Sequence, residues 1–171
     1  MKIREDFVTN SSSSSFILAF DSKEDGYKEI AAMTGKYGSD YVSTLLSDFD
    51  NEPAIPYDDL FKTVESDLES DAYIEICYGH GSWWSNDKDT FKKRWEDAHP
   101  NAIYSDFYDS EEFKAEKERV MKRLFDELIE QIGSRRYLVE LEYEDHSIVG
   151  SELEHEILPN CDFTIRRFSH H

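Results

Sequence analysis

The segment Ser11–Phe20, SSSSSFILAF, decides the fold because a run of hydroxyl side chains leads directly into an unbroken run of apolar ones. Apolar runs of this kind that stop at a polar residue, here Asp21, are typical of buried strands. We expect the strand to begin near Ser14. Serine side chains compete for backbone hydrogen bonds and favour turns or extended chain. We therefore expect a serine-rich N-terminal segment over residues 1–13 and one globular domain over residues 14–171.

Beyond this strand, apolar residues recur at spacings of three and four and predict about five helices. The clearest covers residues 110–132, where Asp109 and Glu112 fit a capping pair and Gly133 follows as a stop. The other helices are expected over residues 22–34, 39–52, 56–68 and 86–99, with one or two helical turns in residues 151–160. Residues 101–110, NAIYSDFYDS, are interpreted as an aromatic-rich loop.

Three further segments have the pattern of strands. Alternation of side chains predicts strands at Tyr73–Tyr78 and Tyr137–Tyr143, and Phe163–Phe168 is the last. The order of elements permits parallel pairing early in the chain and antiparallel pairing at its end. It predicts an α+β or α/β fold, a single domain with a mixed sheet of about four strands packed by about five helices.

The chain is strongly acidic. With 19 Lys and Arg against 38 Asp and Glu, its formal net charge is −19. Such a surface repels phosphate, so we expect no direct binding of nucleic acid and no docking on an anionic membrane. The expected partner is a protein with a basic surface. The charge has two other interpretations: it keeps the protein soluble, or it mimics nucleic acid and inhibits a DNA-binding protein.

Composition also predicts a compartment. No apolar run approaches the roughly 18 residues that a membrane span needs, and the first residues lack the apolar core of a signal peptide. The two cysteines, Cys77 and Cys161, are far apart in sequence, which fits a reducing compartment better than a disulfide framework. We therefore expect a cytoplasmic protein.

The histidines suggest a metal site. Imidazole, carboxylate and thiolate are ligands for zinc or another divalent transition metal. The candidate ligands are His80, His155, Cys161, His170 and His171. Glu154 and Glu156 flank His155 and are candidates for the catalytic general base of a small metal-dependent hydrolase. Because the spacing matches no established zinc motif, surface histidines without a ligand role are the alternative. The glycine-rich nucleotide motifs are absent from the sequence, so we expect no nucleotide cofactor.

Two aromatic segments are candidates for partner binding, because large aromatic side chains dominate the energetics of interfaces. One is the pair Trp83 and Trp84 in GHGSWW, and the other contains Phe107 and Tyr108 in YSDFYDSEEF. Burial in the core is the alternative for the tryptophan pair, and a folded loop that wraps the core is the alternative for the second segment. Serine hydroxyls can accept phosphate or sugar, which makes the serine run a candidate recognition or modification tag. The tag consists of Ser11, Ser12, Ser13, Ser14 and Ser15.

The first 18 residues, MKIREDFVTNSSSSSFIL, fit the signature MKxRxxFV[ST]NSSSSSF. In this string the chain resembles uncharacterised proteins of bacteria and bacteriophages. The resemblance implies a bacterial or mobile-element setting and carries no activity. The acidic charge and the lack of catalytic motifs favour a protein-interaction or accessory module, with the metal-dependent hydrolase and the nucleic-acid mimic as alternatives.

Overall fold

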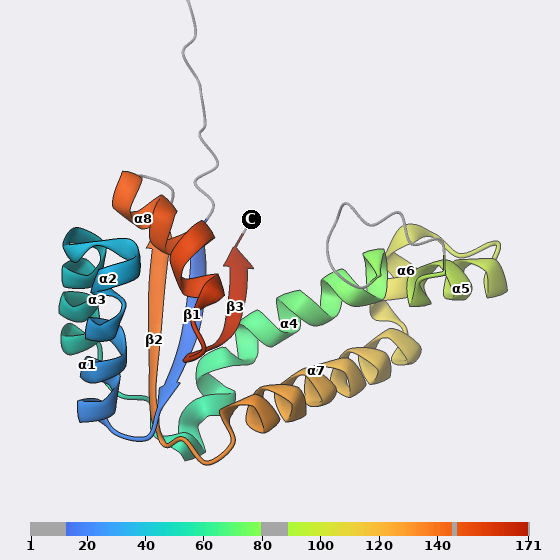
Figure 1. Ribbon diagram of the computed structural model, residues 1–171. Coiled ribbons are helices and arrows are strands. Elements are labelled where there is room, and N and C mark those ends of the chain that lie inside the picture. Colours follow the sequence, from blue (N-terminus) through green and yellow to red (C-terminus); the bar gives the residue numbers. More distant parts are fainter. Residues whose placement is uncertain (1–12, 80–88, 145–146, 171) are drawn as a thin grey trace, which may run out of the picture. The chain divides into compact units, whose positions relative to one another are not determined.

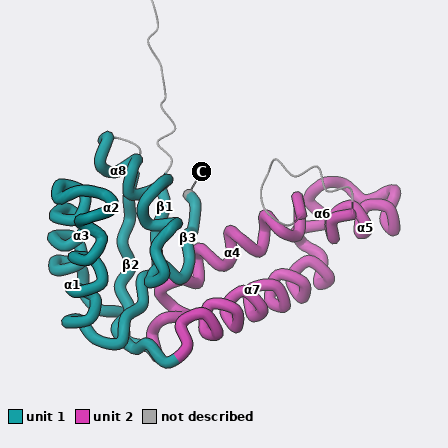
Figure 2. The backbone as a smooth tube through the Cα atoms, in the orientation of Figure 1, with its two compact units in different colours: residues 1–57, 134–171 teal, residues 58–133 magenta. Residues whose placement is uncertain are grey.

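The structure, a computed structural model, describes residues 13–79, 89–144 and 147–170 (Figure 1). The chain divides into two compact units (Figure 2). Unit 1 consists of residues 1–57 and 134–171, and unit 2 of residues 58–133. None of the helices within the described ranges combines the length and the apolar character that crossing a membrane demands.

Unit 1 is built on a sheet in which the first strand of the chain is the central one (Figure 1). β1 (Ser13–Phe20) lies between β2 (Tyr137–Glu144) and β3 (Thr164–His170), and both pairs are antiparallel. The mixed α+β class expected from the sequence is confirmed. The prediction of about four strands is wrong, because the sheet formed by the described residues has three, and the sheet is antiparallel rather than mixed.

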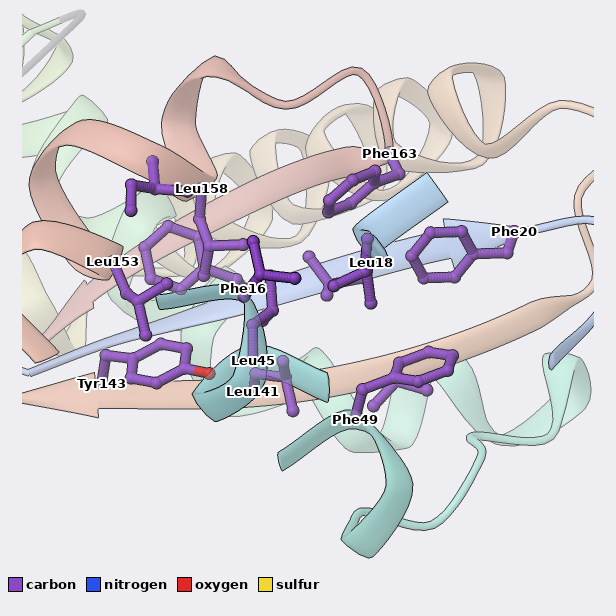
Figure 3. Packing of buried hydrophobic residues seen from close by; sticks show 14 residues of the cluster. Phe16, Leu18, Phe20, Leu45, Phe49, Leu141, Tyr143, Leu153, Leu158 and Phe163 are labelled. Carbon is purple, nitrogen blue, oxygen red and sulfur yellow. The ribbon is translucent and has the colours of Figure 1, made fainter. Parts of the chain in front are cut away.

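The core of unit 1 lies on one face of this sheet (Figure 3). Alternate side chains of β1, those of Phe16, Leu18 and Phe20, belong to it. Phe20 contacts Phe49 edge to face, with ring centroids 5.3 Å apart. Ile17, which points to the opposite face, is also fully buried. Burial on both faces explains why residues Phe16–Phe20 of the strand are apolar at every position rather than at every second one.

Capping and close packing stabilise the helices of unit 1. In chain order they are α1 (Lys23–Ala32), α2 (Thr34–Tyr37), α3 (Ser39–Asn51), α8 (Ile148–Glu152), the π-helical turn η2 (Leu153–Ile157) and the 3₁₀ turn η3 (Leu158–Asn160). The Ser22 hydroxyl caps α1 by accepting from the Asp25 amide at 3.1 Å. Gly26 in α1 allows close packing, because a Cβ there would lie 2.4 Å from Phe49 Cζ.

Unit 2 is helical. The 3₁₀ turn η1 (Tyr57–Asp59) precedes α4 (Leu60–Tyr78), which is followed by α5 (Phe91–Ala98), α6 (Tyr104–Asp109) and α7 (Glu111–Ile132). α4 packs along α7, and the two run in opposite directions (Figure 1). α7 is capped by Ser110, whose hydroxyl accepts from the Phe113 amide at 3.1 Å, and not by Asp109.

Two sequence predictions for unit 2 are corrected. Residues Tyr73–Tyr78 are the last turns of α4 and not a strand. They continue a buried stripe of α4 that recurs every four residues: Leu60, Val64, Leu68, Ala72 and Ile76. The segment interpreted as an aromatic loop contains α6, because the Asp106 carboxylate accepts from the Ile103 amide at 2.9 Å and starts a helix there.

Candidate functional site

Three tyrosines of unit 2 form a connected group, here called the tyrosine cluster. Tyr73 comes from α4, and Tyr104 and Tyr108 lie one turn apart on α6. The Tyr108 hydroxyl donates to the Tyr104 hydroxyl at 3.0 Å and lies 3.3 Å from the Tyr73 hydroxyl. The rings of Tyr73 and Tyr108 stack with centroids 5.9 Å apart, and those of Tyr104 and Tyr108 are 4.9 Å apart. Ring contacts and a chain of hydroxyls therefore fix the three side chains together.

The position of α6 is set by a buried residue between the two tyrosines. Phe107 is only 1% exposed, and its ring centroid lies 5.3 Å from that of Trp95 and 5.0 Å from that of Phe113. Phe107 thus belongs to the packing of unit 2, and its side chain is not accessible to a partner in this structure. Tyr108 is half-buried. The more accessible residues of the segment are Ile103 and Tyr104, which are 67% and 68% exposed.

A lysine of α5 lies on the tyrosine cluster. The Lys92 ammonium is 4.7 Å from the ring centroid of Tyr104 and 5.7 Å from that of Tyr108, both within the range of a cation–π interaction. Its nearest anion in α5 is Glu96, with Nζ 3.8 Å from Oε1. The Lys92 side chain is 20% exposed. An ammonium group is therefore seated between two aromatic rings and a carboxylate.

The surroundings of Tyr108 keep its hydroxyl protonated. Burial, together with hydrogen bonds to Tyr104 and Tyr73, raises the pKa of Tyr108 well above that of a free tyrosine. Burial also raises the pKa of the neighbouring Cys77 thiol, whose Sγ lies 4.0 Å from the Tyr108 hydroxyl. The cluster thus attracts the Lys92 cation through ring faces and not through a phenolate or a thiolate.

A second polar group, here called the Glu154 clamp, lies in unit 1 and consists of Ser14, Glu154 and Arg167. Glu154 is on η2 and is fully buried. Its Oε1 accepts from the Ser14 hydroxyl at 2.7 Å and from Arg167 at 3.0 Å, while Arg167 Nε donates to the Ser14 Oγ at 3.0 Å. Its Oε2 accepts no hydrogen bond from the described residues, and His155 Nε2 lies 3.7 Å away. The clamp joins β1, β3 and η2.

The structure places the candidate metal ligands as follows. His155 is exposed beside Glu154, and Glu156 is exposed on the same turn. Cys161 donates to the Ile157 carbonyl at 3.1 Å, and its Sγ lies 3.9 Å from Met33 Sδ. Burial raises the pKa of the Cys161 thiol to about 11, which disfavours the thiolate that a metal needs.

Across residues 13–79, 89–144 and 147–170, no three His, Cys, Asp or Glu residues are grouped so that they could hold a metal ion. The backbone of His170 ends β3 opposite Ser13. Two of the candidate ligands, His80 and His171, lie outside the described residues.

The remaining candidates fall into two groups. Trp83, Trp84, Ser11 and Ser12 lie outside the described residues. The other serines of the run belong to β1, where Ser13 is half-buried and both Ser14 and Ser15 are buried. Hydroxyls in the middle of a folded sheet are shielded from a modifying enzyme, so modification of Ser14 or Ser15 requires a chain that has not yet folded.

Sequence reasoning missed Ile103 and Tyr104 because their segment was interpreted as a loop. The signal in the sequence was the spacing from Ile103 to Asp106. It matches the spacing between the N-cap residue of a helix and the third helical residue, N3. A helix starting there puts Tyr104 and Tyr108 on one face, four residues apart.

Comparisons with known proteins identify no relative. No family model matches the chain. Searches of the curated proteins and of the solved structures also found no match.

Proposed function

We propose that the chain is a protein-binding module that uses the exposed start of α6 to contact a partner with a basic surface. The observation that carries the proposal is the exposure of Ile103 and Tyr104, two neighbouring large side chains that are each about two-thirds accessible. The other large exposed apolar residues of the described chain are separate from one another in sequence: Phe61, Tyr78 and Ile148. Paired exposed hydrophobic residues of this kind favour an interaction site over a solvated surface.

The rigidity of Tyr104 supports the same function. Its hydroxyl accepts from Tyr108, and its ring lies against both the Tyr108 ring and the Lys92 ammonium. A side chain that is already held in one position loses little conformational entropy when a partner binds. Tyrosine also offers a partner both an apolar ring and a polar hydroxyl, which is why it is common in interface hot spots.

Charge supports a basic partner. The whole chain carries a net charge of −19, and Asp106, Asp109 and Glu112 are exposed on or beside α6. Such a field accelerates the encounter with a positively charged protein and disfavours acidic ones. Binding should therefore weaken as the salt concentration rises, because exposed charges are screened over roughly 10 Å at 0.1 M salt.

A capture experiment with a matched control tests the proposal. The wild-type chain, Tyr104→Ala and Ile148→Ala are each immobilised and exposed to an extract of the source organism. Ile148 is 80% exposed and belongs to α8 of unit 1, so its variant removes an exposed side chain that is not part of α6. We expect one basic protein in stoichiometric amount on the wild type and on Ile148→Ala, lost on Tyr104→Ala and released by 0.5 M salt. The proposal is contradicted if all three immobilised chains retain the basic protein equally, or if none of them retains a partner in stoichiometric amount.

The two alternatives stay predictions from the sequence. The metal-dependent hydrolase requires near-stoichiometric metal in protein purified without chelators, with the metal lost in His155→Ala; mass spectrometry of the metal content tests this. The nucleic-acid mimic requires competition with DNA for a DNA-binding enzyme. Neither has an observation in the described residues that favours it over the α6 surface.

A further inference from the structure

We infer that the ring faces of Tyr104 and Tyr108, with the carboxylate of Glu96, form a binding site for an alkylammonium group. In the free chain Lys92 occupies this site, and a lysine of the basic partner displaces it on binding. The identity of the incoming lysine rests on the proposed function, whereas the site itself does not.

The geometry around Lys92 is that of a ligand in an aromatic cage. Its ammonium lies 4.7 Å from one ring centroid and 5.7 Å from the other, and the rings meet at 57° so that they form two walls. Tyr73 stacks on Tyr108 at an interplanar angle of 22° and supports that ring. Recognition of alkylammonium ions by faces of several aromatic rings is a recurrent use of the cation–π interaction.

Neutral walls determine which cations the site accepts. Because burial and hydrogen bonding hold Tyr108 as a phenol, the site offers ring quadrupoles and only one nearby carboxylate. A carboxylate 3.8 Å from the ammonium attracts it without a hydrogen bond of normal length. Such a site accepts a compact alkylammonium group.

Lys92 can leave the site because it makes no hydrogen bond of normal length to Glu96 there. It is the second residue of α5, and Glu96 lies four residues later on the same helix, where lysine and glutamate commonly pair in solvent. A lysine that swings out of the site leaves both the aromatic walls and the Glu96 carboxylate free for another ammonium. Lys92 thus acts as an internal competitor whose removal should strengthen binding.

A titration that needs no partner tests the site. The probe is tetramethylammonium, which binds ring faces and donates no hydrogen bond, and the readout is the chemical shift of the tyrosine ring protons. Lys92→Ala empties the site, whereas Lys93→Ala removes the same charge from the next residue, whose ammonium pairs with Asp97. We expect Lys92→Ala to bind the probe at least about fivefold more tightly than the wild type, and Lys93→Ala to bind like the wild type.

Two variants of the first wall complete the experiment, each made in the Lys92→Ala background. Tyr104→Phe keeps the ring and should keep the affinity, while Tyr104→Ala removes the ring and should abolish binding. Circular dichroism checks the folding of both variants, and we expect both to remain folded because the Tyr104 side chain is exposed. Equal affinities of Lys92→Ala and Lys93→Ala, or binding that survives Tyr104→Ala, overturn the inference. If the titration succeeds and the capture experiment finds no partner, the inferred ammonium site stands and only the proposed function is contradicted.

Discussion

Replacing Glu154 with alanine tests how a run of identical serines finds its register in the sheet. A strand normally fixes its register because one face is apolar and the other polar, so that a shift by one residue exposes the core. The two faces of β1 do not differ in this way, since Ser13 to Ser15 are alike and the next five residues are all apolar and buried. The Glu154 clamp distinguishes Ser14 from its neighbours, because only one serine can be bonded to Glu154 and Arg167 together.

The magnitude follows from the contacts of the clamp. Removing Glu154 leaves the buried Ser14 hydroxyl without its acceptor and separates Arg167 from its carboxylate. Breaking a buried ion pair in this way costs about 3–5 kcal/mol. The Arg167 side chain is 30% exposed and recovers some hydration, so we expect a loss near the lower end, about 3 kcal/mol of unfolding free energy. Ser14→Ala removes one hydroxyl and should cost about 1–2 kcal/mol.

Urea denaturation followed by circular dichroism measures these losses, and hydrogen exchange of the β1 amides locates them. Ser13→Ala is the control, because Ser13 is half-buried and lies outside the clamp; it should cost less than about 0.5 kcal/mol. The double variant Ser14→Ala with Glu154→Ala should show a coupling of at least about 1 kcal/mol. A Glu154→Ala protein within about 0.5 kcal/mol of the wild type, or a Ser13→Ala loss equal to that of Ser14→Ala, would refute the reasoning.

Three further predictions concern packing, pH and reactivity. Gly26→Ala should destabilise the protein by about 1–3 kcal/mol in urea denaturation, because its Cβ would collide with the buried Phe49 ring. Gly35→Ala is the control: a Cβ at Gly35 would have no atom within 4 Å, so this variant should not be destabilised. Burial and a hydrogen bond to the Asp48 carboxylate of α3 raise the pKa of Tyr143. The contribution of Tyr143 to the free energy of unfolding is therefore complete below about pH 10, where a free tyrosine ionises. It is lost as the pH rises further. The free energy of unfolding of Tyr143→Phe should therefore fall less steeply in alkali than that of the wild type; an identical slope contradicts this. Iodoacetamide at pH 8 should alkylate Cys161, whose pKa is about 11, at least about tenfold more slowly in the folded than in the urea-unfolded chain.

Local signals predicted most of the helices and strands. The serine and apolar run predicted β1 to within one residue, and the heptad-like stripe ending at Gly133 predicted α7. One exception is Tyr73–Tyr78, whose alternating side chains also fit the four-residue stripe of α4. The longer pattern, that of the helix, determines the structure there. A helix that already buries Leu60, Val64 and Leu68 extends most readily by continuing with Ala72 and Ile76.

The arrangement of the sheet and both polar groups could not be predicted from local patterns. Ser14 and Glu154 are 140 residues apart, and no spacing rule joins them. The tyrosine cluster likewise depends on the packing of α4 beside α6, which brings Tyr73 to Tyr108. Tertiary contacts of this range depend on which elements pair, and periodicity within one element carries no information about that choice.

The central place of β1 has a consequence for biosynthesis. Its partners β2 and β3 begin at Tyr137 and Thr164, so the ribosome must add more than a hundred residues before either neighbour exists. At the usual rate of translation this takes on the order of ten seconds. Throughout that time an apolar strand has no partner and is prone to pair with other nascent chains. The apolar part of β1, Phe16–Phe20, is preceded by hydroxyl side chains and followed by the charged Asp21, and polar and charged flanks of this kind oppose such pairing.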